Sequence, residues 1–93
     1  MSEVTMGNSL RGEYSPMEST IFAVLQRGPA TNNQLVRPVY PRKREEPFNA
    51  QIVINRAVTT LGQKLKYYRE PFRLKRRRLP RQRLIENSLV RSK

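Results

Sequence analysis

Residues 50–68, AQIVINRAVTTLGQKLKYY, constrain the fold more than any other part of the chain. On a helical wheel with about 100° per residue, one side collects apolar side chains: Ala50, Ile54, Ala57, Val58, Leu61, Leu65 and Tyr68. The other side is mostly polar and carries Ile52, Asn55, Arg56, Thr59, Gln63 and Lys66, with Thr60 and Tyr67 at its border. Such a helix must bury its apolar side against other elements. The pattern predicts a long helix that begins near Asn49 as its cap.

A first shorter helix is predicted from Ser15-Pro16-Met17-Glu18. Ser15 and Glu18 have the spacing of a capping box, and proline suits the first helical position. Gly28 can end the helix in a left-handed conformation, and the following proline prevents its continuation. We therefore expect a helix over about residues 16–27, with a buried stripe of Met17, Ile21, Val24 and Leu25.

A second short helix is predicted from another capping box and another apolar side. Thr31 and Gln34 form another capping-box pair, and the apolar side is Leu35, Val36, Val39 and Tyr40. Pro38 lacks an N–H and crowds the preceding turn, which limits the regular helix. The prediction is a helix over about residues 32–37, followed by a charged loop, PRKREEP.

After Tyr68 the pattern changes to a period of two, in which Phe72, Leu74 and Arg76 alternate with Arg73, Lys75 and Arg77. Residues 79–82 can turn, and residues 84–86 can return as a partner strand. The alternative is a C-terminal helix that starts at Pro80 and buries Leu84, Ile85 and Leu89. The basic hairpin is the favoured interpretation. The fold class is then mainly α with a small β-hairpin (α+β).

Composition limits the possible functions. The chain of 93 residues has room for one domain and carries 19 Lys and Arg against 7 Asp and Glu, a formal net charge of +12. Such an excess is typical of a protein with an anionic partner. Cys and His are both absent, which excludes disulfides and removes the commonest metal ligand and general base. We expect no enzyme activity, no metal and no cofactor.

The N-terminus has no signal segment, and no apolar run approaches the length of a membrane span. The expectation is therefore an intracellular protein without membrane contact, cytoplasmic and, in a bacterium, nucleoid-associated. The predicted organisation is a flexible N-terminal arm over residues 1–13, a domain over residues 14–86 and a C-terminal tail over residues 87–93.

The predicted order of helix, tight turn, short helix, loop, long helix and basic hairpin is that of a winged helix-turn-helix. The sequence resembles a diverged OmpR/PhoB-type effector domain that lacks a receiver domain. The matching positions are the Ser15-Pro16-Met17-Glu18 signal, the run from Thr31 to Leu35, the Val39-Tyr40 pair, and the helical positions Ile54, Val58, Leu61, Lys64 and Leu65. Arg56 and Gly62 depart from the family's usual residues, and the glycine-aromatic end of its wing has no match.

In such domains the third helix enters the major groove and the wing touches the backbone or the minor groove. The resemblance makes Thr59, Thr60, Gln63 and Lys64 candidate groove contacts. Side-chain chemistry adds Arg56 as a partner for guanine and Asn55 or Gln63 as a partner for adenine. The full set of predicted DNA contacts is Asn55, Arg56, Thr59, Thr60, Gln63, Lys64, Lys66, Arg73, Lys75, Arg76, Arg77, Arg78, Arg81 and Arg83.

Some interpretations stay open. The polar side of the third helix is either a surface that reads bases or an ordinary solvated face, and the arginines are either phosphate contacts or a nonspecific basic tail. Arg42, Lys43 and Arg44 lie where they can touch the DNA backbone. Gly62 permits close approach either of a partner's backbone or of a neighbouring element.

The leading functional hypothesis is a small DNA-binding protein that regulates transcription on duplex DNA. Stand-alone domains of this size resemble products of phages and mobile elements. One alternative is a protein-binding inhibitor or adaptor that docks on RNA polymerase, and another is an RNA or ribosome binder. A monomer or a weak homodimer is expected, with Phe48 or Ile52 as possible dimer contacts.

Overall fold

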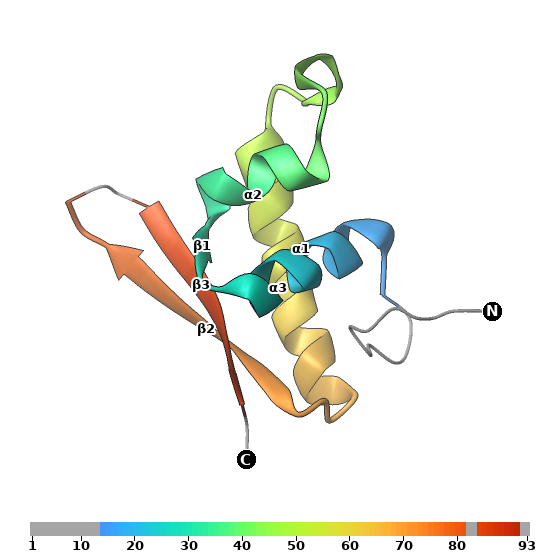
Figure 1. Ribbon diagram of the computed structural model, residues 1–93, viewed down its shortest axis with the longest axis vertical. Helices are drawn as coiled ribbons and strands as arrows, with labels where there is room; N and C mark the ends of the chain where they lie inside the picture. Colours follow the sequence, from blue (N-terminus) through green and yellow to red (C-terminus); the bar gives the residue numbers. More distant parts are fainter. Residues whose placement is uncertain (1–13, 82–83, 92–93) are drawn as a thin grey trace.

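The computed structural model describes residues 14–81 and 84–91. In this part of the chain, three α-helices and a three-stranded antiparallel sheet make an α+β fold. Figure 1 shows the hairpin standing beside α3, with α1 crossing α3 and α2 near one end of it. The elements in chain order are α1 (Pro16–Arg27), β1 (Ala30–Thr31), α2 (Asn32–Val39), a 3-10 helix (Lys43–Glu45), α3 (Ala50–Tyr67), β2 (Phe72–Leu79) and β3 (Leu84–Arg91).

Helix α1 has the predicted bounds and the predicted cap. The Ser15 hydroxyl accepts from the Glu18 backbone at 3.1 Å, and the Glu18 carboxylate accepts from the Ser15 backbone at 2.9 Å. The prediction for Gly28 was wrong in its detail, because its φ of 155° and ψ of 174° are not left-handed helical. The chain has to run out extended at this point, since it enters β1 two residues later.

Helix α2 has the predicted capping box, in which Thr31 and Gln34 exchange bonds of 3.0 and 3.1 Å. Its predicted end at residue 37 was wrong, because the helix continues through Pro38 to Val39. Pro38 has no N–H to donate to the Gln34 carbonyl, so this one helical bond is missing. The Tyr40 backbone N–H still donates to the Val36 carbonyl at 2.8 Å and closes the last turn.

The apolar side of α3 forms the centre of the core, as predicted. Ala50, Ile54, Val58, Leu61 and Leu65 are buried. They join a cluster with Ile21, Phe22 and Leu25 of α1, with Ala30 of β1, and with Leu35 and Val36 of α2. Ala57 is half-buried against this cluster, and Tyr68 is half-buried with its ring centre 5.6 Å from that of Tyr14. Asn49 occupies the N-cap position, but its side chain makes no capping bond.

The end of α3 is built around Arg69, which has a φ of 55°. Its N–H donates to the Lys66 carbonyl at 3.1 Å, and the Glu70 N–H donates to the Leu65 carbonyl at 2.9 Å. These two bonds are those of a Schellman motif, in which glycine usually takes the left-handed position. The tight end directs the chain back along α3 as β2.

The basic hairpin is confirmed, and the alternative C-terminal helix was wrong. Strands β2 and β3 pair in register from Phe72 opposite Arg91 to Leu79 opposite Leu84. Strand β3 continues to Arg91, so residues 87–91 belong to the sheet and not to the predicted tail. The predicted N-terminal arm and Arg83 lie outside the described residues.

Two features of the sheet were not predicted. Strand β1 has two residues and pairs with β3, which places β3 in the middle of the order β1-β3-β2. The second feature is the contact between α3 and β2. A Cβ atom at Gly62 would lie 2.9 Å from Leu74 Cδ2, so this glycine lets the strand approach the helix closely. Of the two roles considered for Gly62, the structure shows the contact with a neighbouring element.

Candidate nucleic-acid interface

The side of α3 that faces away from the core is exposed along its length. Ile52, Arg56, Thr59, Gln63 and Lys66 are all exposed, and α3 contains no Asp or Glu. The side chains of Arg56, Gln63 and Lys66 make no hydrogen bond or ion pair with any residue of the described chain. These three side chains are therefore available to a ligand.

Three other predicted contacts are occupied within the protein. The Arg76 guanidinium, on β2, donates from Nε to Asn87 Oδ1 at 2.9 Å, from Nη1 to Thr59 Oγ1 at 3.0 Å, and from Nη2 to Asn55 Oδ1 at 2.5 Å. The Thr59 hydroxyl in turn donates to the Asn55 carbonyl at 3.0 Å. Asn55, Thr59 and Arg76 therefore connect α3 to the hairpin.

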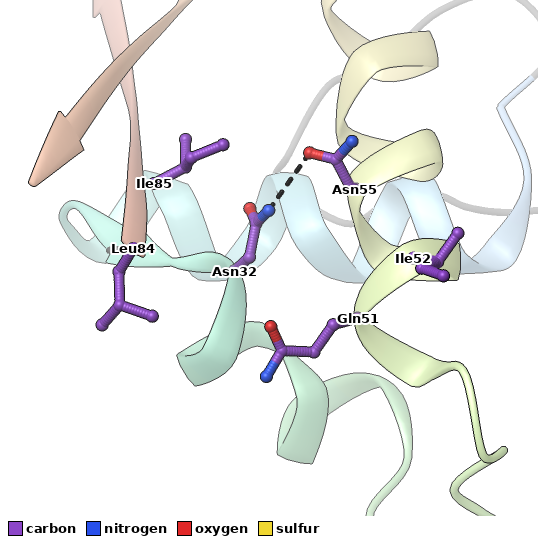
Figure 2. A pocket seen from close by; sticks show the side chains of 6 residues that line it. All are labelled: Asn32, Gln51, Ile52, Asn55, Leu84 and Ile85. Carbon is purple, nitrogen blue, oxygen red and sulfur yellow. Dashed lines mark hydrogen bonds between the residues drawn. The ribbon is translucent and has the colours of Figure 1, made fainter. Parts of the chain in front are cut away.

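The connection extends to the other strands through amide groups. Asn87 is 0% exposed and donates from Nδ2 to the Ala30 carbonyl at 3.1 Å and to Asn32 Oδ1 at 2.8 Å. Asn32 donates from Nδ2 to Asn55 Oδ1 at 3.2 Å, the bond drawn in Figure 2. We call Asn32, Asn55, Thr59, Arg76 and Asn87 the Arg76 network. It joins α2, α3, β2 and β3, and through Ala30 it also reaches β1.

Burial lowers the pKa of the Arg76 guanidinium, although an arginine remains charged at any physiological pH. Inside a protein, a charged donor with several amide and hydroxyl acceptors strengthens each of its bonds. The Arg76 network therefore holds the hairpin at a defined position relative to the exposed side of α3.

The hairpin cations divide into two groups. Arg73 donates to the carbonyls of Glu70 and Phe72 at 2.9 and 3.0 Å, and Arg77 forms an exposed ion pair of 3.1 Å with Glu86. Lys75, Arg78 and Arg81 are exposed and have no partner among the described residues. The second group is the part of the predicted phosphate-binding set that the structure leaves available.

Lys64 belongs to a different surface. Its Nζ lies 2.9 Å from Glu18 Oε1 and 5.8 Å from the centre of the Tyr14 ring. Tyr14 donates from its hydroxyl to Glu70 Oε2 at 3.3 Å. Burial raises the pKa of Tyr14, and the negative charge of Glu70 raises it further. This cluster ties the beginning of α1 to the end of α3. Thr60 is half-buried at the border of the exposed side.

A hollow of about 310 Å³ lies between the first half of α3 and the beginning of β3. Its lining residues are Asn32, Gln51, Ile52, Asn55, Leu84 and Ile85. Figure 2 shows Leu84 and Ile85 on one side, Ile52 and Asn55 on the other, and Asn32 between them. A second hollow between α3 and β2 brings Gln63 and Lys66 next to Arg73 and Arg76.

Sequence reasoning singled out Asn55 but missed the other two amides of the Arg76 network, Asn32 and Asn87. Asn87 had a usable signal, because a period of two along β3 places it between Ile85 and Leu89 on the inner side of the sheet. Asn32 had none, since it simply follows the cap residue Thr31. Its role depends on the arrival of residues 23 and 55 positions later in the chain.

No family model, curated protein or solved structure matches this chain in the three comparisons. Across residues 14–81 and 84–91, no helix has the length and apolar character needed to cross a membrane. The same residues contain no group of three or more acidic, Cys or His side chains that suits a metal ion. The geometry and chemistry of the site itself are therefore the basis for a function.

Proposed function

We propose that this chain is a winged-helix DNA-binding domain that regulates transcription. In this proposal α3 enters the major groove of duplex DNA and the β2–β3 hairpin lies on the backbone. The observation that carries it is the exposed, acid-free side of α3 next to the basic strand β2. Arg56, Gln63 and Lys66 have no partner within the described chain and lie together on that side.

The arrangement of elements supports the proposal. The order α1-β1-α2-α3-β2-β3, with β3 between the other two strands, is the order of winged helix-turn-helix domains. In helix-turn-helix proteins the second helix of the motif carries the base contacts. Helix α3 takes that place here, and its exposed side is long enough to follow the groove.

The distribution of charge also supports it. From Gln51 to Ile85 the only acidic residue in the sequence is Glu70, and it is buried. The same span includes Arg56, Lys66, Lys75, Arg78 and Arg81 as exposed cations. A surface of this kind attracts a polyanion and neutralises its phosphates, which supplies most nonspecific affinity for DNA.

The side chains suit two base contacts. Arg56 can donate two hydrogen bonds to guanine, and Gln63 can exchange two with adenine. They are seven residues apart, which separates them by about 10 Å along the helix axis. That distance is close to three base-pair steps of DNA at about 3.4 Å each. Lys66 and the hairpin cations are placed to contact phosphates, which position the protein without reading sequence.

The test is selection from a random duplex library near physiological salt, with wild-type protein and with Arg56→Ala/Gln63→Ala. We expect a defined motif for wild type and loss of preference at two positions in the double variant. The matched control is Gln26→Ala/Arg27→Ala, which removes the same two residue types from exposed positions of α1. The control variant should select the wild-type motif.

Other outcomes would contradict the proposal. A motif that survives Arg56→Ala/Gln63→Ala unchanged would remove α3 as the reading element. Weak enrichment of any sequence by wild type and by both double variants would leave only electrostatic attraction to DNA. A preference for structured RNA over duplex DNA at matched salt would favour RNA binding instead.

A further inference from the structure

Ile52 is an unusual residue for the exposed side of α3. It is 58% exposed, although the same side otherwise carries polar and cationic residues. It lies one helical turn before Arg56, so the two side chains lie next to each other along the helix. Ile52 thus places an apolar side chain at the beginning of the proposed DNA interface, where an apolar group of the DNA can contact it.

The surroundings of Ile52 favour apolar contact over hydrogen bonding. It lines the hollow of about 310 Å³, and Leu84 and Ile85 of β3 line the opposite side (Figure 2). Asn32 uses both its amide nitrogen and its amide oxygen in bonds within the protein. Gln51 donates its amide to Asn33 Oδ1 at 2.7 Å. Among the described residues, Gln51 Oε1 and Asn55 Nδ2 are the amide atoms of the hollow that remain without a bond.

Duplex DNA presents one apolar group in the major groove, the C5-methyl of thymine, and aliphatic side chains recognise it by contact. We propose that Ile52 reads a thymine methyl group about two base-pair steps from the base contacted by Arg56, because four residues span about 6 Å along the helix axis. This inference rests on the proposed function and adds a specificity determinant to it. The expected recognition sequence then contains a thymine whose methyl group, and not its hydrogen-bonding edge, is selected.

The charge around Ile52 argues against a second copy of the chain as its partner. Arg56 lies one turn away, and the whole sequence has a formal net charge of +12. Two copies brought together at this surface would place unpaired cations opposite each other. DNA brings a methyl group and phosphates to the same surface, so it satisfies both the apolar side chain and its cationic neighbours.

The experiment compares two random duplex libraries, one made with thymine and one with uracil, which lacks only the methyl group. For wild type we expect one position at which thymine is enriched and uracil is not. In the enriched duplex, replacing that thymine by uracil should weaken binding about fourfold, the effect of removing one buried methyl group. For Ile52→Ala the two libraries should give the same motif, and the uracil replacement should have no effect.

The control is Val90→Ala, which shortens another exposed aliphatic side chain, on β3. It should keep the full sensitivity to uracil. A strong motif that is identical in both libraries for wild type would overturn this inference and leave the proposed function standing. A methyl effect that persists in Ile52→Ala would also overturn it. The inference would fail as well if Ile52→Ala changed the oligomeric state of the protein but not its response to uracil. Weak enrichment in both libraries would overturn the proposed function and this inference together.

Discussion

Arg76 and Arg78 lie two residues apart on β2 and have opposite roles. Arg76 is half-buried and bonds to Asn55, Thr59 and Asn87, whereas Arg78 is exposed and has no partner in the described chain. Both point to the same side of the strand because their spacing is two residues. The difference arises from the neighbouring elements. Arg76 lies beside α3, whose Asn55 and Thr59 accept its hydrogen bonds, whereas Arg78 lies closer to the end of the hairpin.

We expect Arg76→Ala to lower the free energy of unfolding by about 1–3 kcal/mol. The reason is that the fully buried Asn87 loses the donor to its side-chain oxygen, and an unsatisfied buried acceptor costs about that much. Urea unfolding followed by circular dichroism measures it. Arg78→Ala is the matched control and should change stability by less than about 0.5 kcal/mol, as other exposed substitutions do. Equal effects of the two variants would show that the network contributes nothing to stability.

At this scale the sequence could identify residue types but not their partners. The predicted groove contacts Asn55 and Thr59 lie toward the polar side of α3, as the wheel indicates. Their bonds to Arg76 connect residues 17 and 21 positions apart, and no local pattern reports such a bond. The same holds for Lys64, whose carboxylate partner Glu18 is 46 residues away.

Between elements, the contact of α3 with β2 depends on Gly62. The absence of a side chain there leaves room for Leu74, which contacts the helix where a Cβ would stand. Glycine in the middle of a helix costs about 1 kcal/mol relative to alanine. Gly62 therefore lowers the intrinsic stability of α3 but allows the hairpin to approach it closely.

The close contact predicts that the effects of substitutions at Gly62 and Leu74 on stability are coupled. Gly62→Ala should stabilise the protein by about 1 kcal/mol when Leu74 is also alanine, because only the gain in helix propensity remains. In the wild-type background the gain should be smaller or reversed, since the new methyl group displaces Leu74. A double-mutant cycle by urea unfolding measures the difference. Equal effects of Gly62→Ala in both backgrounds would contradict the contact.

Elements with local signals were predictable, and elements without them were not. The two capping boxes start α1 and α2 at residues that interact within three positions, so the sequence alone locates them. Strand β1 has only two residues and pairs with residues 86 and 87, so no local pattern could reveal it. The extension of α2 past Pro38 depends on a backbone bond from Tyr40 that propensity does not count.

Among the described residues, exposed cations without a partner lie on the hairpin and on α3, and others lie at residues 42–44 and on α1. Lys75, Arg78 and Arg81 are exposed on or just after β2 and lack a partner among the described residues, whereas Arg27 is exposed on α1. If the hairpin lies on the DNA backbone, its cations neutralise phosphates and release counterions from the DNA. The charge of Arg27 on α1 releases none. The position of a charge then matters more than the net charge.

We expect Lys75→Gln/Arg78→Gln/Arg81→Gln to reduce the dependence of affinity on salt. The slope of log K against log salt should become less steep by about 0.9 for each phosphate that the variant no longer neutralises. Fluorescence anisotropy with the selected duplex at several salt concentrations measures it. Arg27→Gln should leave the slope unchanged. A reduction proportional to the number of charges removed, wherever they lie, would contradict a defined position of the hairpin on the backbone.

Strand β3 has one further consequence because it lies between the other two strands. It pairs with β2 along eight positions and holds Ala30, which is 57 residues away, through Asn87. A single cut within β3 would therefore release the hairpin and the link between the first two helices at once.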